Sequence, residues 1–194
     1  MKTRVVVLAS GSGSNFQALI DYSNTKITNY EIVGLIVNVP NAYALARAQK
    51  HNIKSVVIDH KAFEERSLFE VALQNTLIEM GAELVVCAGF MRILGAAFVA
   101  KWQRRIINIH PSLLPKYKGL HTHERAIAAG DKHGGCTVHF VNAGVDEGEI
   151  IAQTKVPILT GDTAEALAAR VLVQEHALYP QCVDKIARDL LKLA

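Results

Sequence analysis

The sequence predicts an α/β protein with a doubly wound, mostly parallel sheet of about seven strands, helices on both faces and a late antiparallel strand pair. Short β-branched runs alternate with helical segments through the first half of the chain. These runs are apolar without alternation, as in strands that are covered on both faces. Near the end, two strand-like runs are joined by a short loop rich in Gly and Asp, which favours antiparallel pairing.

Each element is expected from its local composition. Runs rich in Val, Ile and Leu predict the first five strands at 5–8, 32–37, 55–58, 84–88 and 106–110. Helical patterns predict helices at 15–22, 42–51, 63–80 and 98–104, and a further one that begins near His123 and runs to Ala129. The antiparallel pair is expected at 137–141 and 150–154. A last helix is expected from Asp162, because Asp162 and Glu165 have the spacing of a capping box.

The composition fits one globular domain covering residues 1–194. Half of the residues are hydrophobic, and 21 basic against 18 acidic residues give a net charge of +3, too mild for a nucleic-acid binder. The three cysteines form no CxxC motif, so neither a disulfide framework nor a cysteine zinc site is expected. The chain has no signal peptide pattern and no apolar run approaching the ~20 residues of a membrane span, so we expect a cytoplasmic protein.

A glycine-rich turn follows the first strand, with Gly11, Gly13, Ser14 and Asn15 opening a helix. Free backbone N–H groups at such a helix start can hold a phosphate. A dinucleotide site is disfavoured, because Phe16 stands where a third glycine would be and the second strand leads to Asn38 rather than an acid. The alternative without a ligand is a tight strand–helix turn.

Two polar residues near the end of the fifth strand form a second candidate site. Asn108 and His110 are two apart, so their side chains share a face, and Pro111 ends the strand at the carboxyl edge. A His there can transfer protons or stabilise an oxyanion, and an Asn can donate to the same oxygen. Asp146, in the loop of the late pair, could orient and charge this imidazole. Ordinary strand-end and turn roles are the alternatives for all three.

Three further features have a functional and a structural interpretation. Glu175 falls on the apolar face of the last helix, where a carboxylate needs a partner or a ligand. Met91, Arg92, Ile93 and Leu94 follow the fourth strand and would suit a flat aromatic ligand with an acid group, or be ordinary packing. His121 and His123 form a lone H-x-H without a third ligand, so no metal site is expected.

Together these motifs resemble the phosphoribosylglycinamide formyltransferases, folate-dependent enzymes of purine synthesis, over nearly the whole chain. The motifs that carry the resemblance are 9–15, 88–94, 108–115, 135–141, 146–148 and 174–176. The resemblance implies a Rossmann-like formyltransferase fold and transfer of a formyl group from 10-formyltetrahydrofolate to the amine of glycinamide ribonucleotide, without a metal.

The resemblance also implies roles for individual residues. It assigns Asn108, His110 and Asp146 to catalysis, and it assigns the nucleotide to the glycine turn and Glu175. It assigns the folate to Arg66, Met91, Arg92, Ile93, Leu94, Asn108, Asp146 and the loop that starts at Val141. Protonated His110 and the Asn108 amide would stabilise the oxyanion, and Asp146 would favour the charged form of His110.

Other functions remain open at this point. A formyltetrahydrofolate deformylase or a transfer-RNA formyltransferase shares this catalytic domain but carries an extra domain, before it in the first and after it in the second. A non-catalytic nucleotide-binding protein would not need Asn108, His110 and Asp146 together.

The expected partners are the two small-molecule substrates, with no nucleic acid and no membrane. A homodimer is compatible with the sequence. Residues 101–125 carry a net charge of +5 that could attract anionic substrates, with Lys116 and Lys118 as contributors.

Overall fold

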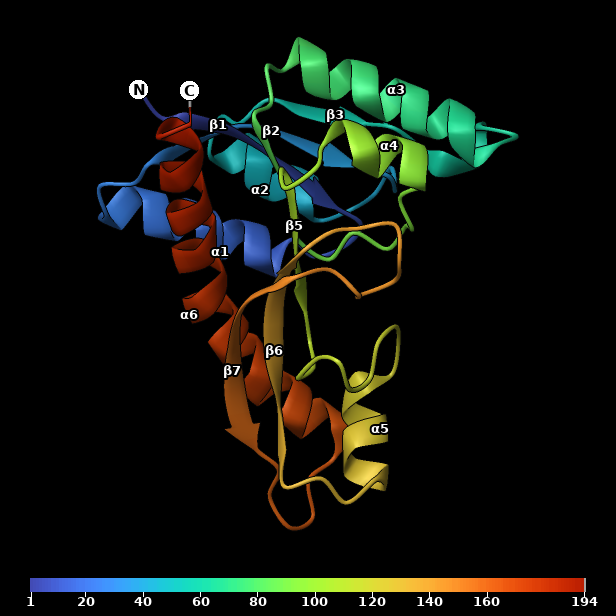
Figure 1. Cartoon of the computed structure of the whole chain (residues 1–194), viewed down its shortest axis with the longest axis vertical. Coiled ribbons are helices and arrows are strands. Elements are labelled where there is room, and N and C mark those ends of the chain that lie inside the picture. The colour runs from blue at the N-terminus through green and yellow to red at the C-terminus, as the bar shows by residue number, and fades with distance from the viewer. Residues whose placement is uncertain (194) are drawn as a thin grey trace.

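The seven strands form one mixed sheet, as expected (Figure 1). The computed structural model describes residues 1–193. The order across the sheet is β3-β2-β1-β4-β5-β6-β7, with parallel pairing from β3 to β5 and antiparallel pairing of β6 with both β5 and β7. The strands are β1 (Thr3–Ala9), β2 (Tyr30–Val37), β3 (Ser55–Val57), β4 (Leu84–Cys87), β5 (Ile106–His110), β6 (His133–Phe140) and β7 (Ile150–Pro157).

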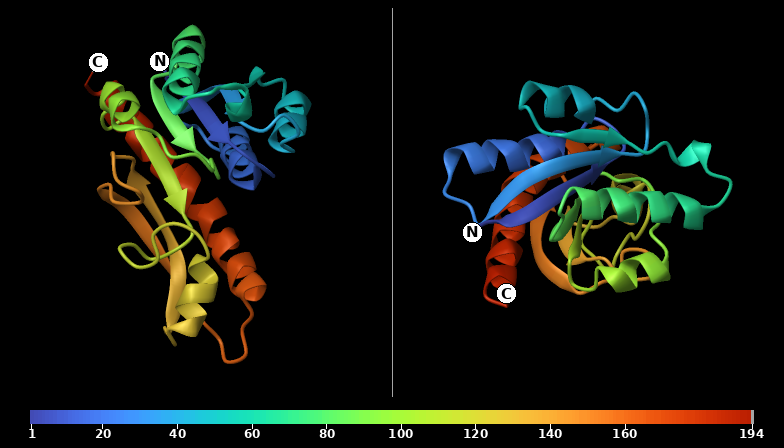
Figure 2. Two further views of the ribbon diagram at one scale, coloured as in Figure 1. Left: turned by 90° about the vertical axis from the view of Figure 1, so that its right-hand side faces the viewer. Right: turned by 90° about the horizontal axis from the view of Figure 1, so that it is seen from above.

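Helices cover both faces of the sheet and enclose two apolar cores (Figure 2). One core packs α1 (Ser14–Thr25), α2 (Ala44–Lys50) and α6 (Ala164–Leu191) against the sheet. The other core packs α3 (Arg66–Glu79) and α4 (Ala96–Lys101) against the opposite face. The short helix α5 (Thr122–Ala128) lies beside β6, and among residues 1–193 no helix has the length and apolar character needed to cross a membrane.

The strand order reverses between β1 and β4, and this switch point brings two of the predicted segments together. The chain leaves β1 toward β2 on one side, whereas β4 lies on its other side. Ser10, after β1, donates its backbone N–H to the carbonyl oxygen of Gly89, after β4, at 3.0 Å, and Met91 N–H donates to Ser10 Oγ at 2.7 Å. Ligands of open α/β sheets bind in the crevice at such a point.

Two expected boundaries in the second half are wrong for identifiable reasons. Strand β6 begins at His133 rather than 137, because Gly134 and Gly135 belong to the strand despite their low strand propensity. A Cβ on Gly135 would lie 2.1 Å from the carbonyl oxygen of Thr154, so a glycine allows the close approach of β7. Strand β7 continues to Pro157, which an edge strand tolerates at its end.

The predicted capping box of the last helix is also wrong. Helix α6 begins at Ala164, and its N-cap is Thr163 rather than Asp162. Thr163 Oγ1 accepts a hydrogen bond from Ala166 N–H at 3.2 Å. Asp162 instead accepts from the backbone of Leu159 at 2.7 Å and pairs with Arg170. Because Asp162 pairs with Arg170, its side chain does not cap the helix, and the hydroxyl of Thr163, another favoured N-cap residue, does so instead.

Candidate active site

The glycine turn after β1 exposes the start of α1. Gly13 takes a left-handed conformation with φ of 69°, and a Cβ there would lie 2.7 Å from Cβ of Ala44 in α2. Both facts favour glycine at this position. Helix α1 begins at Ser14 with no side-chain cap, so its first N–H groups are available to an anion.

Asn15, at the beginning of α1, forms a hydrogen bond with Glu175 of α6, which is far away in the sequence. Both are buried, and Asn15 Nδ2 donates to Glu175 Oε2 at 2.7 Å. Burial raises the pKa of the Glu175 carboxyl above its usual range, while the hydrogen bond from Asn15 opposes that rise. Among the described residues, Asn15 Oδ1 is buried without a hydrogen-bond partner. An unpaired acceptor beside an uncapped helix start is suited to a ligand that brings a donor of its own.

Asn108 and His110 lie on β5 as expected, and the antiparallel partner strand adds a residue that the pattern analysis did not single out. His139 of β6 is directly opposite Asn108 in register, and Asn108 Nδ2 lies 3.2 Å from His139 Nε2. His139 Nδ1 lies 2.8 Å from the carbonyl oxygen of Phe140, which fixes the ring. His139 therefore orients the Asn108 amide. Only the strand register could have indicated this pairing.

Asp146 lies between the two imidazoles. Its Oδ2 is 3.3 Å from His110 Nδ1, and its Oδ1 is 3.6 Å from His139 Nε2. Gly119 N–H also donates to Asp146 Oδ2 at 2.9 Å. Burial alone would raise the pKa of this carboxyl, but His139, the Gly119 N–H group and His110 together hold it below its usual range. Asp146 is thus an ionised carboxylate at a partly buried position.

His110 is buried and has an acceptor at each ring nitrogen. Nδ1 lies against Asp146, and Nε2 lies 2.9 Å from the carbonyl oxygen of Tyr117. Burial lowers the pKa of His110, and the opposing effects of the Tyr117 carbonyl and Asp146 do not overcome it. Asp146 favours the charged imidazole as expected, yet in the free protein the neutral form prevails at pH 7, because burial has the larger effect.

These groups border a cavity of about 720 Å³, a size typical of small-molecule sites. It is lined by eight of the predicted site residues: Met91, Arg92, Ile93, Leu94, Asn108, His110, Val141 and Asp146. Its rim carries exposed apolar side chains, with Met91 65% and Ile93 59% accessible. Arg66 is not among the lining residues; it begins α3 and its Nε lies 3.5 Å from Glu70.

Half of the six Lys and Arg residues in 101–125 are paired with acids. Arg104 contacts Glu149 at 2.5 Å, and Lys116 and Lys118 each lie 2.8 Å from an acid, Asp131 and Glu147 respectively. These acids follow the basic stretch in the sequence, so the net charge of residues 101–125 alone overstated the attraction of anions.

His121 lies 3.1 Å from Glu124, and residues 1–193 contain no group of three or more His, Cys, Asp or Glu side chains that could hold a metal ion.

The chain is similar to proteins of known activity along nearly its whole length. Residues 3–183 match the family model described as formyl transferase. Phosphoribosylglycinamide formyltransferase of Escherichia coli is 42% identical over 189 residues, covering 97% of this chain and 89% of that protein. The trifunctional purine biosynthetic protein adenosine-3 of Chironomus tentans is 49% identical over 196 residues. That match covers 99% of this chain but 14% of the relative, so the chain spans a small part of the trifunctional proteins.

Solved structures agree with the fold. Phosphoribosylglycinamide formyltransferase of Brucella melitensis superposes with a TM-score of 0.92 at 45% identity, covering 96% of each chain. Glycinamide ribonucleotide transformylase 1 of Symbiobacterium toebii gives a TM-score of 0.94 at 41% identity, covering 97% of this chain and 89% of that one. The matched residues 3–183 and these relatives place the chain in the formyl transferase family.

Proposed function

We propose that this protein transfers a formyl group from 10-formyltetrahydrofolate to the amine of glycinamide ribonucleotide, a step of purine biosynthesis. The observation that carries the proposal is the meeting of Asn108, His110 and Asp146 at one wall of the 720 Å³ cavity. Relatives that cover nearly the whole chain are named for this reaction. The substrates would be small molecules, no step below uses a metal ion, and residues 1–194 would act as one cytoplasmic domain.

The nucleotide phosphate is proposed to bind at the glycine turn. Gly11 and Gly13 let the backbone approach the phosphate closely, and the N–H groups at Ser14 and Asn15 are uncapped. The buried Asn15 and Glu175 pair would then receive the ribose or amine region, since Asn15 Oδ1 lacks a donor among the described residues. The close approach of the segments after β1 and β4 would bring the amine toward the cavity.

The folate is proposed to occupy the cavity. The apolar side chains of Met91, Ile93, Leu94 and Val141 provide contact for a flat pterin ring, and Arg92 provides a cation for its acidic part. Arg66 would contact the folate only further out, beyond the cavity itself. The formyl group would then lie near Asn108 and His110.

The chemistry requires stabilisation of a tetrahedral oxyanion, which forms when the amine attacks the formyl carbon. The Asn108 amide, oriented by His139, donates to this oxygen. His110 is neutral beforehand, and a developing negative charge beside its ring favours the protonated form. The second proton comes from the attacking amine by way of the water that Asp146 holds, and it passes on to the departing folate nitrogen when the oxyanion collapses. The imidazolium therefore exists only while the oxyanion does.

Asp146 has two tasks in this scheme. It holds His110 Nδ1 at 3.3 Å and stabilises the imidazolium once it forms. As an ionised carboxylate it also accepts from a water molecule that carries the proton from the attacking amine to the departing folate nitrogen. The carbon–nitrogen bond to the nucleotide forms as the bond to the folate breaks, so the products are the formylated nucleotide and tetrahydrofolate.

An absorbance assay of the folate product, with glycinamide ribonucleotide present or omitted, tests the reaction. We expect product only when the nucleotide is present, because the proposed nucleophile is its amine. Formation of folate product at the same rate without nucleotide would instead indicate a deformylase, and no product in either case would contradict folate chemistry altogether.

Replacing Asp146 tests its role in the reaction. Asp146→Asn should lower turnover about 100-fold or more, because the imidazolium loses its counter-charge and the water loses its acceptor. Asp189→Asn, the same change at an exposed site near the end of α6, is the matched control and should keep normal turnover. Thermal melts should show both variants folded, and near-normal turnover of folded Asp146→Asn would contradict the assignment.

Glu175→Gln should make the protein more stable at pH 7 and leave stability unchanged at pH 4. Burial raises the folded-state pKa of Glu175, so its charged form is disfavoured in the fold. The penalty is absent below the unfolded pKa of 4.5, grows as the pH rises from there to the folded value, and is constant above it. Glutamine removes that penalty and can still accept from Asn15.

Urea denaturation of both proteins at the two pH values measures this difference. Glu64→Gln, at an exposed site, is the control and should show no gain at either pH. Equal stability of Glu175→Gln and the parent at pH 7, or a gain that persists at pH 4, would refute the account of this buried carboxylate.

A further inference from the structure

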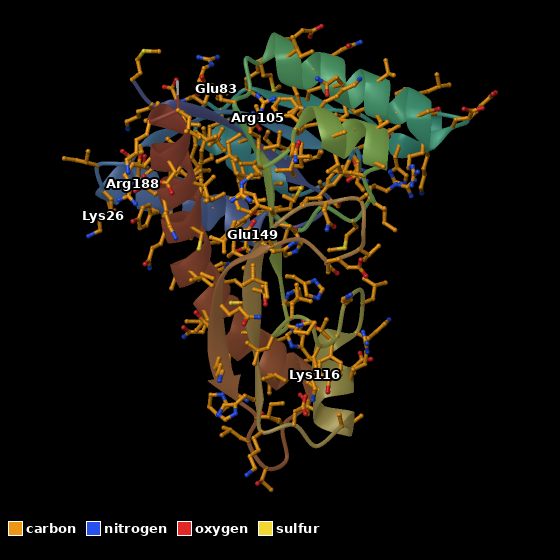
Figure 3. The ribbon with its side chains drawn as sticks, in the orientation of Figure 1. Lys26, Glu83, Arg105, Lys116, Glu149 and Arg188 are labelled. Carbon is orange, nitrogen blue, oxygen red and sulfur yellow. The ribbon has the colours of Figure 1, made fainter. Side chains whose placement is uncertain are left out.

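A second cavity, of about 270 Å³, lies next to the active site and takes no part in the proposed reaction. Its walls are the segment 111–117 after β5, the helix α5 and the beginning of β6, with Lys155 reaching in from β7. Figure 3 shows Lys116 beside α5, at the end of the molecule away from the glycine turn. The cavity is far larger than the ~30 Å³ that one water molecule occupies in the liquid.

Basic side chains dominate this cavity. Three lysines line it, Lys116, Lys132 and Lys155, together with His123 and His133, and Asp131 is the one acid among the lining residues. Asp131 is already engaged, because Lys116 Nζ lies 2.8 Å from its Oδ1 and the Tyr117 hydroxyl donates to its Oδ2 at 2.6 Å. Within residues 1–193, Lys132 and Lys155 have no acidic partner within 4.0 Å. Two exposed lysines without an acidic partner among the described residues therefore border one small recess.

The sheet brings Lys155 to this cavity. On β7, Gln153 donates to the carbonyl oxygen of Leu114 at 2.8 Å, which shows that this face of the strand looks toward the segment 111–117. Lys155 is two residues further along and so lies on the same face. It pairs with Gly135 of β6, where a Cβ would come within 2.7 Å of Leu113 Cδ2. The absence of a side chain at Gly135 keeps the loop close to the lysine.

We propose that this cavity is a binding site for a small multivalent oxyanion of the phosphate or pyrophosphate class. Like charges that converge on a recess repel one another unless an anion compensates them, and lysine ammonium groups are strong donors to phosphate oxygens. The recess is polar, unlike the adjoining 720 Å³ cavity with its Met, Ile and Leu side chains, so it suits a compact anion rather than a flat apolar ring.

An anion in this site would act on the catalytic histidine through two backbone carbonyls. Ser112 Oγ donates to the carbonyl oxygen of Lys116 at 2.7 Å, and the carbonyl oxygen of Tyr117 lies 2.9 Å from His110 Nε2. An anion that draws the Lys116 ammonium away from Asp131 shifts the segment that holds the His110 ring. The bound anion is therefore expected to lower turnover without occupying the proposed nucleotide site.

Binding of inorganic pyrophosphate, measured by calorimetry, tests the site independently of the reaction. The double variant Lys132→Gln, Lys155→Gln should bind pyrophosphate at this cavity about 10-fold more weakly, because two of the cationic donors are lost. Lys54→Gln, Lys185→Gln removes the same charge from exposed sites elsewhere and is the matched control. Repeating the titration with saturating glycinamide ribonucleotide, whose phosphate would occupy the glycine turn, separates the two contributions. Unchanged binding in the first double variant, or equal loss in the control, would overturn the proposal.

The coupling is tested by turnover at saturating nucleotide. Pyrophosphate should lower kcat in the parent and in the Lys54→Gln, Lys185→Gln control, and should not lower it in the Lys132→Gln, Lys155→Gln variant, whose kcat without pyrophosphate should be normal. Inhibition that survives in that variant, or that saturating nucleotide abolishes in the parent, would place the effect at the glycine turn and contradict the inference.

Discussion

The active site depends on one partly buried carboxylate between two imidazoles. Asp146 contacts His110 with one oxygen and His139 with the other, and the N–H group of Gly119 completes its surroundings. Removing charge from this centre would leave His110 without a counter-charge and would weaken one contact of His139, which orients Asn108. Asp146 stands in the loop before β7 and has a left-handed backbone conformation there, with φ of 52°, which is uncommon for a residue other than glycine and is often found at functional sites.

The topology explains why two substrates can meet there. The switch point between β1 and β4 places the uncapped start of α1 beside the segment 89–94, while β5 and β6 bring Asn108 and His139 into register at the same edge. The compact phosphate of a nucleotide and the flat pterin ring of a folate need different surroundings, and the sheet supplies them from different strands. Only their reacting groups need to share the space around His110 and Asp146.

Local patterns in the sequence predicted the strand and helix order and several of the residues that line the cavity, because apolar runs and strand-end motifs are local signals. They could not predict features that depend on partners far along the chain. Thr163 rather than Asp162 caps α6, since Arg170 pairs with Asp162. Likewise, the importance of His139 follows from antiparallel register, and the lowered pKa of His110 follows from burial, which no spacing reveals.

Asp146 raises the proton affinity of an imidazole that burial keeps neutral in the free protein. An NMR titration of the His110 ring, assigned by comparison with His110→Asn, measures this in the parent and in Asp146→Asn. The account predicts a pKa below the usual 6.5 in the parent and a lower value still in the variant, because the electrostatic support of Asp146 is lost. A His110 pKa that stays the same or rises in Asp146→Asn would contradict it.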